Sequence, residues 1–226
     1  MCPLTNWDTA EWEIGWGVRS MFDGSLRGVR DVALAPLARA LGSVSPTTLT
    51  AIGLAVGIGS AGSAAAGNQN LALGLWLANR LIDGLDGAVA RQQGTTSDRG
   101  GYFDLLADFI VYAAVPVGLV IGSPAPDGLA VPLGLLLGSF YVNAVSWLAL
   151  SALMEKRSNY TMPERAGDTR KTALIMPSGL IEGAETVIFI AICLLWPGLL
   201  GWWFTGMAFL VAVTSVQRAL WASRIL

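Results

Sequence analysis

The sequence predicts an all-α, polytopic membrane protein with six transmembrane helices preceded by an N-terminal interfacial amphipathic helix. Of its 226 residues, 54% are hydrophobic and 13% are charged, whereas an ordinary soluble domain has about 25% charged residues. Six apolar runs are long enough to cross a hydrocarbon core of about 30 Å, which takes about 20 helical residues. The basic residues lie toward one side of these runs, which is typical of membrane proteins.

Two parts follow each other along the chain. Residues 1–46 form a cytoplasmic and interfacial segment, and residues 47–226 form one six-helix membrane domain, because no polar linker divides them. Near the end of the first part, apolar side chains recur at roughly helical spacing: Leu26, Val29, Ala33, Leu37 and Leu41. Charged residues occupy other positions of that helical wheel, so we expect a helix that lies in the membrane interface.

The six spans are placed at 47–66, 71–90, 102–121, 129–154, 174–196 and 202–222. Three connections are short and rich in the Gly, Pro and Asn residues that mark turns, namely GNQN, GSPAPDG and PGLLG. These turns contain no Lys or Arg, so the other segments carry all fourteen. Since basic residues are retained in the cytoplasm, we expect both termini and the active site at the cytoplasmic face of a bacterial or archaeal plasma membrane.

Composition excludes several kinds of site. The sequence has no histidine, which rules out a Ser-His-Asp triad, a histidine base and a histidine-rich metal site. Cys2 and Cys193 lie far apart, so neither a disulfide framework nor a cysteine metal motif is present. No basic patch indicates a nucleic acid polymer as a partner. Catalysis would therefore use carboxylates, Arg, Lys or hydroxyl groups.

The stretch NRLIDGLDGAVARQQGTTSDRGGYFDLLADFIVY places four aspartates between apolar runs. Asp83 and Asp86 are three residues apart, and Asp104 and Asp108 are four apart, so each pair shares one face of a helix. Each charge at membrane depth costs roughly 2.5 to 3.5 kcal/mol, and the two nearby arginines neutralise only part of the cluster. Carboxylates without His or Cys favour hard ions such as Mg²⁺, Mn²⁺ or Ca²⁺, so we expect a two-metal site.

The pattern in this stretch is DxxDGxxAR, eight further residues, and then GxxxDxxxD. Its fixed positions are Asp83, Asp86, Gly87, Ala90, Arg91, Gly100, Asp104 and Asp108. This pattern is similar to the signature of the CDP-alcohol phosphotransferases, membrane enzymes that make phospholipid head groups. The six spans and the interfacial helix also resemble that family's architecture, and SPTTLT at 45–50 resembles the usual opening of its first span.

The resemblance implies transfer of a phosphatidyl group from a CDP-diacylglycerol-like donor to a small polar alcohol, with release of CMP. It implies two divalent cations, Mg²⁺ or Mn²⁺, held by the aspartates of the pattern: Asp83, Asp86, Asp104 and Asp108. Asp108 would also be the base that deprotonates the acceptor hydroxyl. The donor would contact residues of the same pattern: Asp83, Gly87, Ala90, Arg91 and Gly100. A homodimer surrounded by membrane lipids is expected from the resemblance as well.

The acceptor site is less well defined by the sequence. The loop EKRSNYTMPERAGDTRK carries five basic residues, which either hold an anionic group of a substrate or only reflect retention in the cytoplasm. Glu182 and Glu185 lie near the start of the fifth span, outside the family signature. Acidic residues within a membrane are functional candidates, although solvation of a helix end explains them equally well. Our acceptor candidates are Arg170, Lys171, Arg218 and Glu182.

Three alternatives use the same residues. A soluble donor of the CDP-choline type would transfer its head group to diacylglycerol by the same chemistry. Intramembrane prenyltransferases also place aspartate pairs on helices, but they leave the linked Gly, Ala and Arg positions unexplained. A divalent-cation transporter needs buried carboxylates, yet transporters often contain internal repeats, and this sequence has one aspartate cluster.

Overall fold

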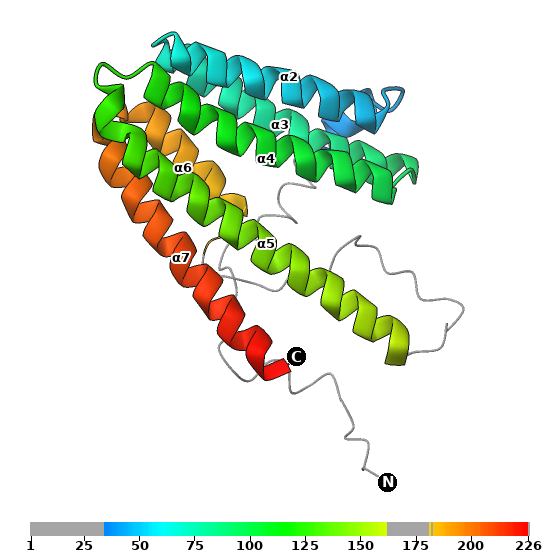
Figure 1. Cartoon of the computed structure of the whole chain (residues 1–226). Helices are drawn as coiled ribbons and strands as arrows, with labels where there is room; N and C mark the ends of the chain where they lie inside the picture. The colour runs from blue at the N-terminus through cyan, green and yellow to red at the C-terminus, as the bar shows by residue number, and fades with distance from the viewer. Residues whose placement is uncertain (1–33, 162–180, 182, 226) are drawn as a thin grey trace.

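The computed structural model describes residues 34–161, 181 and 183–225, and this part of the chain is helical with no β-strand (Figure 1). Residues 34–40 form a short helix. The longer described helices are α2 (Pro46–Ala65), α3 (Gln69–Gln93), α4 (Asp98–Ile121), α5 (Ala130–Thr161), α6 (Gly183–Leu195) and α7 (Leu200–Ile225). The short 3-10 helices η2 (Pro126–Leu129) and η3 (Pro197–Leu199) precede α5 and α7. The predicted all-α class is confirmed.

Local sequence sets the ends of the first three long helices. Pro46 lies in the first turn of α2, where a missing N–H leaves no hydrogen bond unmade. Asn68 and Ser97 cap α3 and α4, because each side chain accepts a backbone N–H at 3.2 Å. Gly67 and Gly94 have φ values of +77° and +64°, a left-handed conformation that favours glycine at helix ends. Consecutive helices therefore reverse direction, and α3 ends beside the start of α4.

The helices pack as a bundle of α2, α3 and α4 and as a pair of α5 and α7 (Figure 1), with α6 contacting α3, α4 and α7. A Cβ atom on Gly118 or Gly122 of α4 would overlap the backbone carbonyl oxygens of Ala61 and Ala64 of α2. Small residues allow such close approach between membrane helices. This contact fixes α4 against α2, and with it the position of the two signature aspartates on α4, Asp104 and Asp108.

The largest apolar core lies where α6 meets the other helices. Trp76 of α3 and Phe204 of α7 are fully buried there, and the Trp76 indole N–H donates to the Val187 carbonyl of α6 at 3.3 Å. Large apolar side chains also lie on the outside, such as Leu77 and Trp202, which are 54% and 79% exposed. An exposed apolar surface is stable against lipid, because lipid tails are as apolar as the side chains themselves.

Four described helical segments are long and apolar enough to cross a membrane: Pro46–Ala65, Asp98–Ile121, Pro126–Arg157 and Pro197–Arg224. The chain is thus an integral membrane protein, but the predicted count of six spans is not confirmed. α3 has 25 residues, yet its part from residue 80 onward carries two arginines and two aspartates. The described part of α6 has 13 residues, fewer than the roughly 20 that cross a core of about 30 Å.

The predicted N-terminal amphipathic helix falls mainly on residues 1–33, which lie outside the described residues. Where the chain is described, the helices begin and end within about four residues of the predicted spans, except that α5 continues to Thr161, beyond the predicted end at 154. The predicted start of the fifth span, at 174, lies outside the described residues.

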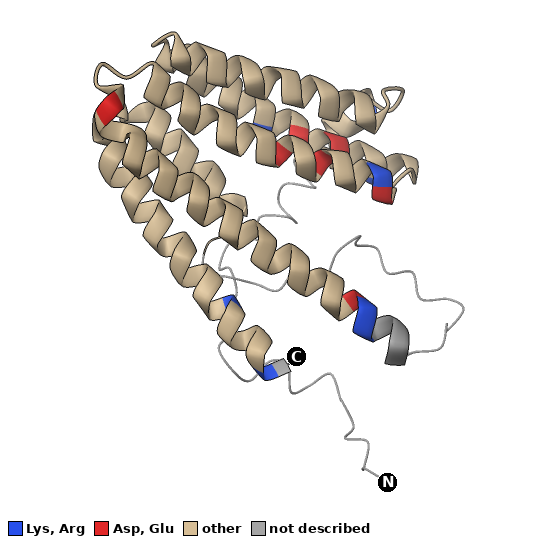
Figure 2. Ribbon diagram, viewed as in Figure 1, with Lys and Arg blue, Asp and Glu red and all other residues tan. Residues whose placement is uncertain are grey.

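The three predicted turns lie together at one end of the molecule (Figure 1). Figure 2 shows that the described Lys and Arg residues lie away from these turns, whereas the acidic Asp127 of η2 lies among them. This separation agrees with the charge asymmetry found in the sequence.

Candidate active site

The four signature aspartates meet where the second half of α3 lies beside the first half of α4. Figure 2 shows the acidic residues of the two helices gathered side by side. Asp83 interacts with both Asp104 and Asp108 across this contact, and Asp86 interacts with Asp104. The antiparallel α3–α4 arrangement therefore joins two pairs that the sequence places about twenty residues apart.

Arg80 forms the closest described ion pair of the cluster. Its Nη1 lies 2.8 Å from Oδ1 of Asp108 and 3.8 Å from Oδ2 of Asp83. The Arg80 side chain is 11% exposed, and the two carboxylate side chains are 26% and 28% exposed. Ion pairs shielded from water are held more strongly than surface pairs, so Arg80 has a marked influence on where Asp108 points.

Polar and aromatic neighbours fix Arg80 in turn. Its Nε and Nη2 donate to Oδ1 of Asn79 at 2.8 and 2.6 Å, and its Nη1 donates to the Tyr112 hydroxyl at 2.9 Å. The guanidinium carbon lies 4.9 Å from the ring centre of Trp76 and 5.1 Å from that of Tyr112, within the range of cation–π attraction. Asn79 also donates to the Gly53 carbonyl of α2 at 2.8 Å. Three helices therefore hold one guanidinium group in place.

Asp86 is held from α2. The Thr50 hydroxyl lies 2.7 Å from Oδ2 of Asp86, and it also lies 3.1 Å from the Pro46 carbonyl oxygen. Hydrogen bonds to charged groups are stronger than those between neutral groups, so the bond to Asp86 is the more consequential of the two. The first turns of α2 thereby set the direction of one predicted metal ligand.

The donor set fits a hard divalent cation. Oδ1 of Asp104 is buried and accepts no hydrogen bond from the described residues, a state that a cation would relieve. A cavity of about 10 Å³ between α2, α3 and α4 is lined by Asp83, Asp86 and Asp108 among others, and it has room for about one water-sized sphere.

The carboxylates do not yet converge on one point. In the described part of the chain, no three acidic side chains are arranged so that they could hold one metal ion. The Asp86 carboxylate contacts Thr50 of α2, and the Asp108 carboxylate contacts Arg80 of α3. Metal binding would therefore require side-chain rotation at these aspartates.

The predicted donor-binding residues lie farther along the same helices. A Cβ atom on Gly87 would approach only the Arg91 guanidinium, at 3.2 Å, and one on Gly100 only the Ser97 hydroxyl, at 3.3 Å. No other described helix packs on these two glycines, so close helix packing does not account for them. Ala90 is half-buried and Arg91 is exposed. The small residues Gly87, Ala90 and Gly100 therefore leave a helix surface without large side chains near the Arg91 guanidinium.

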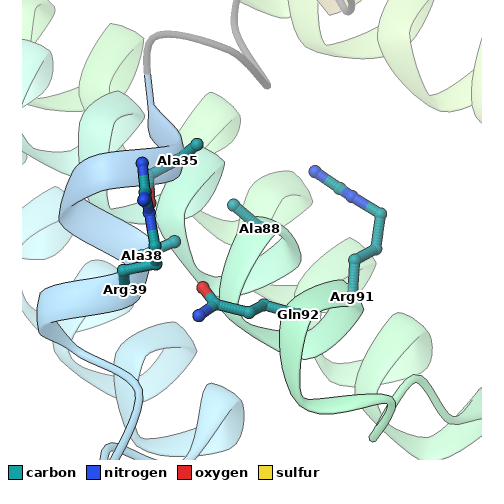
Figure 3. Close-up of a pocket in the computed structure, with 6 residues that line it drawn as sticks. All are labelled: Ala35, Ala38, Arg39, Ala88, Arg91 and Gln92. Carbon is teal, nitrogen blue, oxygen red and sulfur yellow. The ribbon is translucent and has the colours of Figure 1, made fainter.

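A cavity of about 320 Å³ lies between the 34–40 helix and the end of α3. Its lining residues are Ala35, Ala38, Arg39, Ala88, Arg91 and Gln92. Figure 3 shows Arg39 and Arg91 on opposite sides of Ala88, with small alanine side chains between them. The Arg91 side chain thus borders both this cavity and the bare backbone at Gly87.

The acceptor candidates are placed only in part. Arg218 of α7 is 6% exposed, and its Nη1 donates to the Asn143 side chain at 2.8 Å and to the Ser146 hydroxyl at 2.9 Å, both on α5. These contacts join α5 to α7 and involve none of the four signature aspartates. Arg170, Lys171 and Glu182 lie outside the described residues.

Sequence reasoning missed three residues that contact the cluster directly or through Arg80, namely Thr50, Asn79 and Tyr112. Tyr112 lies one helical turn after Asp108, and Asn79 is a polar residue inside an apolar run beside Arg80. Those two positions were signals that could have been followed, because polar groups within a membrane need partners. Thr50 offered no comparable signal, since the choice of Asp86 as its partner depends on how α2 packs.

Replacing Thr50 with Val is expected to weaken Mn²⁺ binding about 10- to 100-fold, the usual loss when a residue that orients a metal ligand is removed. The side chain keeps its shape but loses the hydroxyl that contacts Asp86. Isothermal titration of the purified protein with Mn²⁺ would measure the change. Thr50→Ser keeps the hydroxyl and should bind like the original protein. Equal affinities for the Val and Ser variants would contradict the prediction.

Comparisons with known proteins agree with this geometry. A sequence profile described as CDP-alcohol phosphatidyltransferase matches residues 43–214. Inner membrane protein YnjF of Escherichia coli (strain K12) is 37% identical over 161 residues, which cover 71% of this chain and 72% of that protein. The matched profile region includes every position of the aspartate pattern.

Solved structures share the fold. Phosphatidylinositol phosphate synthase (PgsA1) of Mycobacterium tuberculosis with CDP-DAG bound superposes with a TM-score of 0.65 at 22% identity, covering 83% of this chain and 92% of that chain. The same synthase in complex with manganese and citrate gives a TM-score of 0.64 at 22% identity, covering 84% and 88%. At this identity the likeness describes the arrangement of helices alone.

Proposed function

The chain belongs to the CDP-alcohol phosphatidyltransferase family, and from this premise we propose that it transfers a phosphatidyl group from a CDP-diacylglycerol-like donor to a small polar alcohol, releasing CMP. Membership makes the chain a membrane-bound transferase of phospholipid biosynthesis, and not the cation transporter or prenyltransferase considered from sequence. The observation that carries the proposal is the meeting of four signature aspartates at the α3–α4 contact. A fold relative that binds CDP-DAG supports this donor.

The carboxylates of Asp83, Asp86, Asp104 and Asp108 would hold two divalent cations, Mg²⁺ or Mn²⁺. The oxygen-only donor set and the buried Asp104 oxygen support this assignment, as does the fold relative that contains manganese. When bound, such ions supply positive charge at the diphosphate and make the acceptor hydroxyl more acidic. Phosphoryl-type transfer depends mainly on such positioning and charge.

The chain's own residues then have separate tasks. The acceptor hydroxyl oxygen bonds to the phosphorus that carries diacylglycerol, the bond from that phosphorus to the CMP oxygen breaks, and Asp108 takes the hydroxyl proton. Arg91 would pair with a donor phosphate. Gly87, Ala90 and Gly100 would let the nucleotide approach the helix backbone, because no described helix occupies that surface at either glycine.

The acceptor would contact residues beyond this cluster. We keep Arg170, Lys171, Arg218 and Glu182 as candidates, with a basic set suited to a phosphorylated alcohol and a carboxylate suited to a hydroxyl or amine. Of these, Arg218 is already oriented by Asn143 and Ser146. Because Arg218 is buried between α5 and α7, any contact it makes with the acceptor would be a fixed one.

The wider organisation follows from the same premise. We propose that residues 47–226 form one catalytic membrane domain with six spans, that 1–46 form the cytoplasmic and interfacial segment, and that the protein is a homodimer. Both termini and the active site would face the cytoplasm, as the distribution of Lys and Arg indicates. The likeness to an inner membrane protein supports a bacterial plasma membrane.

Release of CMP tests the function directly. The purified full chain would be given CDP-diacylglycerol with Mg²⁺ or Mn²⁺ and a panel of acceptors, comprising an amino alcohol, a polyol and their phosphorylated forms. A parallel reaction would contain CDP-choline and diacylglycerol. We expect CMP in the first reaction with at least one acceptor.

The two reactions separate the alternatives. CMP in the parallel reaction alone would show that the donor is the soluble CDP-alcohol. No CMP from any combination of donor, acceptor and ion would contradict the proposed function. Identification of the lipid product by mass spectrometry would name the acceptor class.

A further inference from the structure

Arg80 is not one of the eight signature positions, yet it lies within ion-pair distance of two signature aspartates. It lies one turn before Asp83 on α3, and its Nη1 is 2.8 Å from Asp108 and 3.8 Å from Asp83. These two carboxylates come from different helices. A single guanidinium therefore bridges α3 and α4 at the carboxylate proposed as the base.

The neighbours of Arg80 restrain its side chain in one position. Three of its nitrogen atoms donate to Asn79 or Tyr112 at 2.6 to 2.9 Å, and the Trp76 and Tyr112 rings lie about 5 Å from the guanidinium. Asn79 is itself anchored to the Gly53 carbonyl of α2. A side chain restrained on several sides loses little further freedom when it holds a partner, which is a requirement for positioning a reacting group.

We propose that Arg80 is a positioning residue that acts as a fixed internal cation, orienting Asp108 and sharing the Asp83 and Asp108 carboxylates with the divalent ions. The inference rests on the proposed roles of these aspartates. Arg80 keeps its charge at any physiological pH, so it holds Asp108 in the cluster before any metal arrives. It also opposes metal binding, because a positive charge a few ångströms away repels a divalent cation.

The two effects of Arg80 act in opposite directions, which gives a distinctive test. Arg80→Gln removes the charge and keeps a hydrogen-bonding side chain. We expect Mn²⁺ to bind at least about tenfold more tightly, because repulsion is lost, while kcat falls about 10- to 100-fold at saturating Mn²⁺, because Asp108 is no longer oriented. Isothermal titration measures the first quantity and CMP release measures the second.

Arg80→Lys provides a second variant with the charge retained. Lysine carries the same charge but cannot reproduce the planar fork of donors, so Mn²⁺ affinity should stay within about threefold while kcat falls and the KM for donor stays unchanged. Arg224→Gln removes the same charge at an exposed position near the end of α7, and it should leave both quantities unchanged. Thermal unfolding of each purified variant reports on the fold.

The outcomes separate the inference from its premise. Mn²⁺ binding that is unchanged or weaker in folded Arg80→Gln would overturn the role as an internal cation. Full kcat in Arg80→Lys would overturn the role in orienting Asp108. If Arg80→Gln does not fold, the Lys variant alone decides. A failure of the proposed function appears instead as an original protein that releases no CMP, and the Mn²⁺ titrations still test the charge effect in that case.

Discussion

Asp108→Asn is expected to reduce kcat about 10²- to 10⁴-fold, the usual range for removal of a general base. Asparagine has nearly the same shape but cannot accept the proton of the acceptor hydroxyl. Because the asparagine carbonyl oxygen can still act as a ligand and three other carboxylates remain, Mn²⁺ affinity should fall by no more than about tenfold. CMP release at saturating Mn²⁺ measures kcat, and isothermal titration measures the affinity for Mn²⁺.

A matched variant makes this result interpretable. Asp127→Asn changes an exposed aspartate in η2, at the opposite end of the molecule from the cluster, and should leave both quantities unchanged. If Asp108→Asn keeps full turnover, Asp108 is not the base. If its Mn²⁺ affinity falls by a large factor and saturating Mn²⁺ restores full turnover, Asp108 acts as a metal ligand alone.

Asp86→Ala is expected to lower Mn²⁺ affinity at least about 100-fold and to reduce CMP release to background at micromolar Mn²⁺. The substitution removes a carboxylate that α2 already orients through Thr50 at 2.7 Å, and a lost metal ligand costs at least as much as a lost supporting residue, for which 10- to 100-fold is usual. Millimolar Mn²⁺ should restore part of the activity, because weak binding is overcome by concentration.

Removal of metal from the original protein gives the corresponding control. Treatment with a chelator followed by dialysis should abolish CMP release, and added Mg²⁺ or Mn²⁺ should return it. Asp127→Ala should respond to chelator and ion in the same way as the original protein. Full activity of Asp86→Ala at micromolar Mn²⁺ would contradict the assignment of Asp86 as a ligand.

Much of the fold could be predicted from composition and turn chemistry. The apolar runs gave the positions of α2, α3 and α4 to within about four residues, and ends of these helices have local causes such as Asn68, Gly94 or Ser97. The number of spans could not be predicted in the same way. α3 carries its charges inside an otherwise apolar helix, so hydropathy alone does not decide how deeply it enters the membrane.

The candidate site was predictable in its residue types and less so in its contacts. Asp83 with Asp86, and Asp104 with Asp108, share helix faces because three or four residues make one turn. The partners of these aspartates were not predictable. Thr50 is 36 residues from Asp86 along the chain, and Arg218 is 75 residues from Asn143, so both contacts depend on which helices pack together.

The sequence by itself determined that this protein is an α-helical membrane protein with a four-aspartate pattern, because composition and residue spacing along a helix act locally; that it is an enzyme followed from the resemblance of this pattern to a family signature. Only the tertiary structure decided that Arg80 bridges Asp83 and Asp108 and that Thr50 orients Asp86. These contacts require α2, α3 and α4 to approach closely, which the absence of side chains at Gly118 and Gly122 permits. Packing between helices, which depends on shape over the whole bundle, set the directions of the reactive carboxylates.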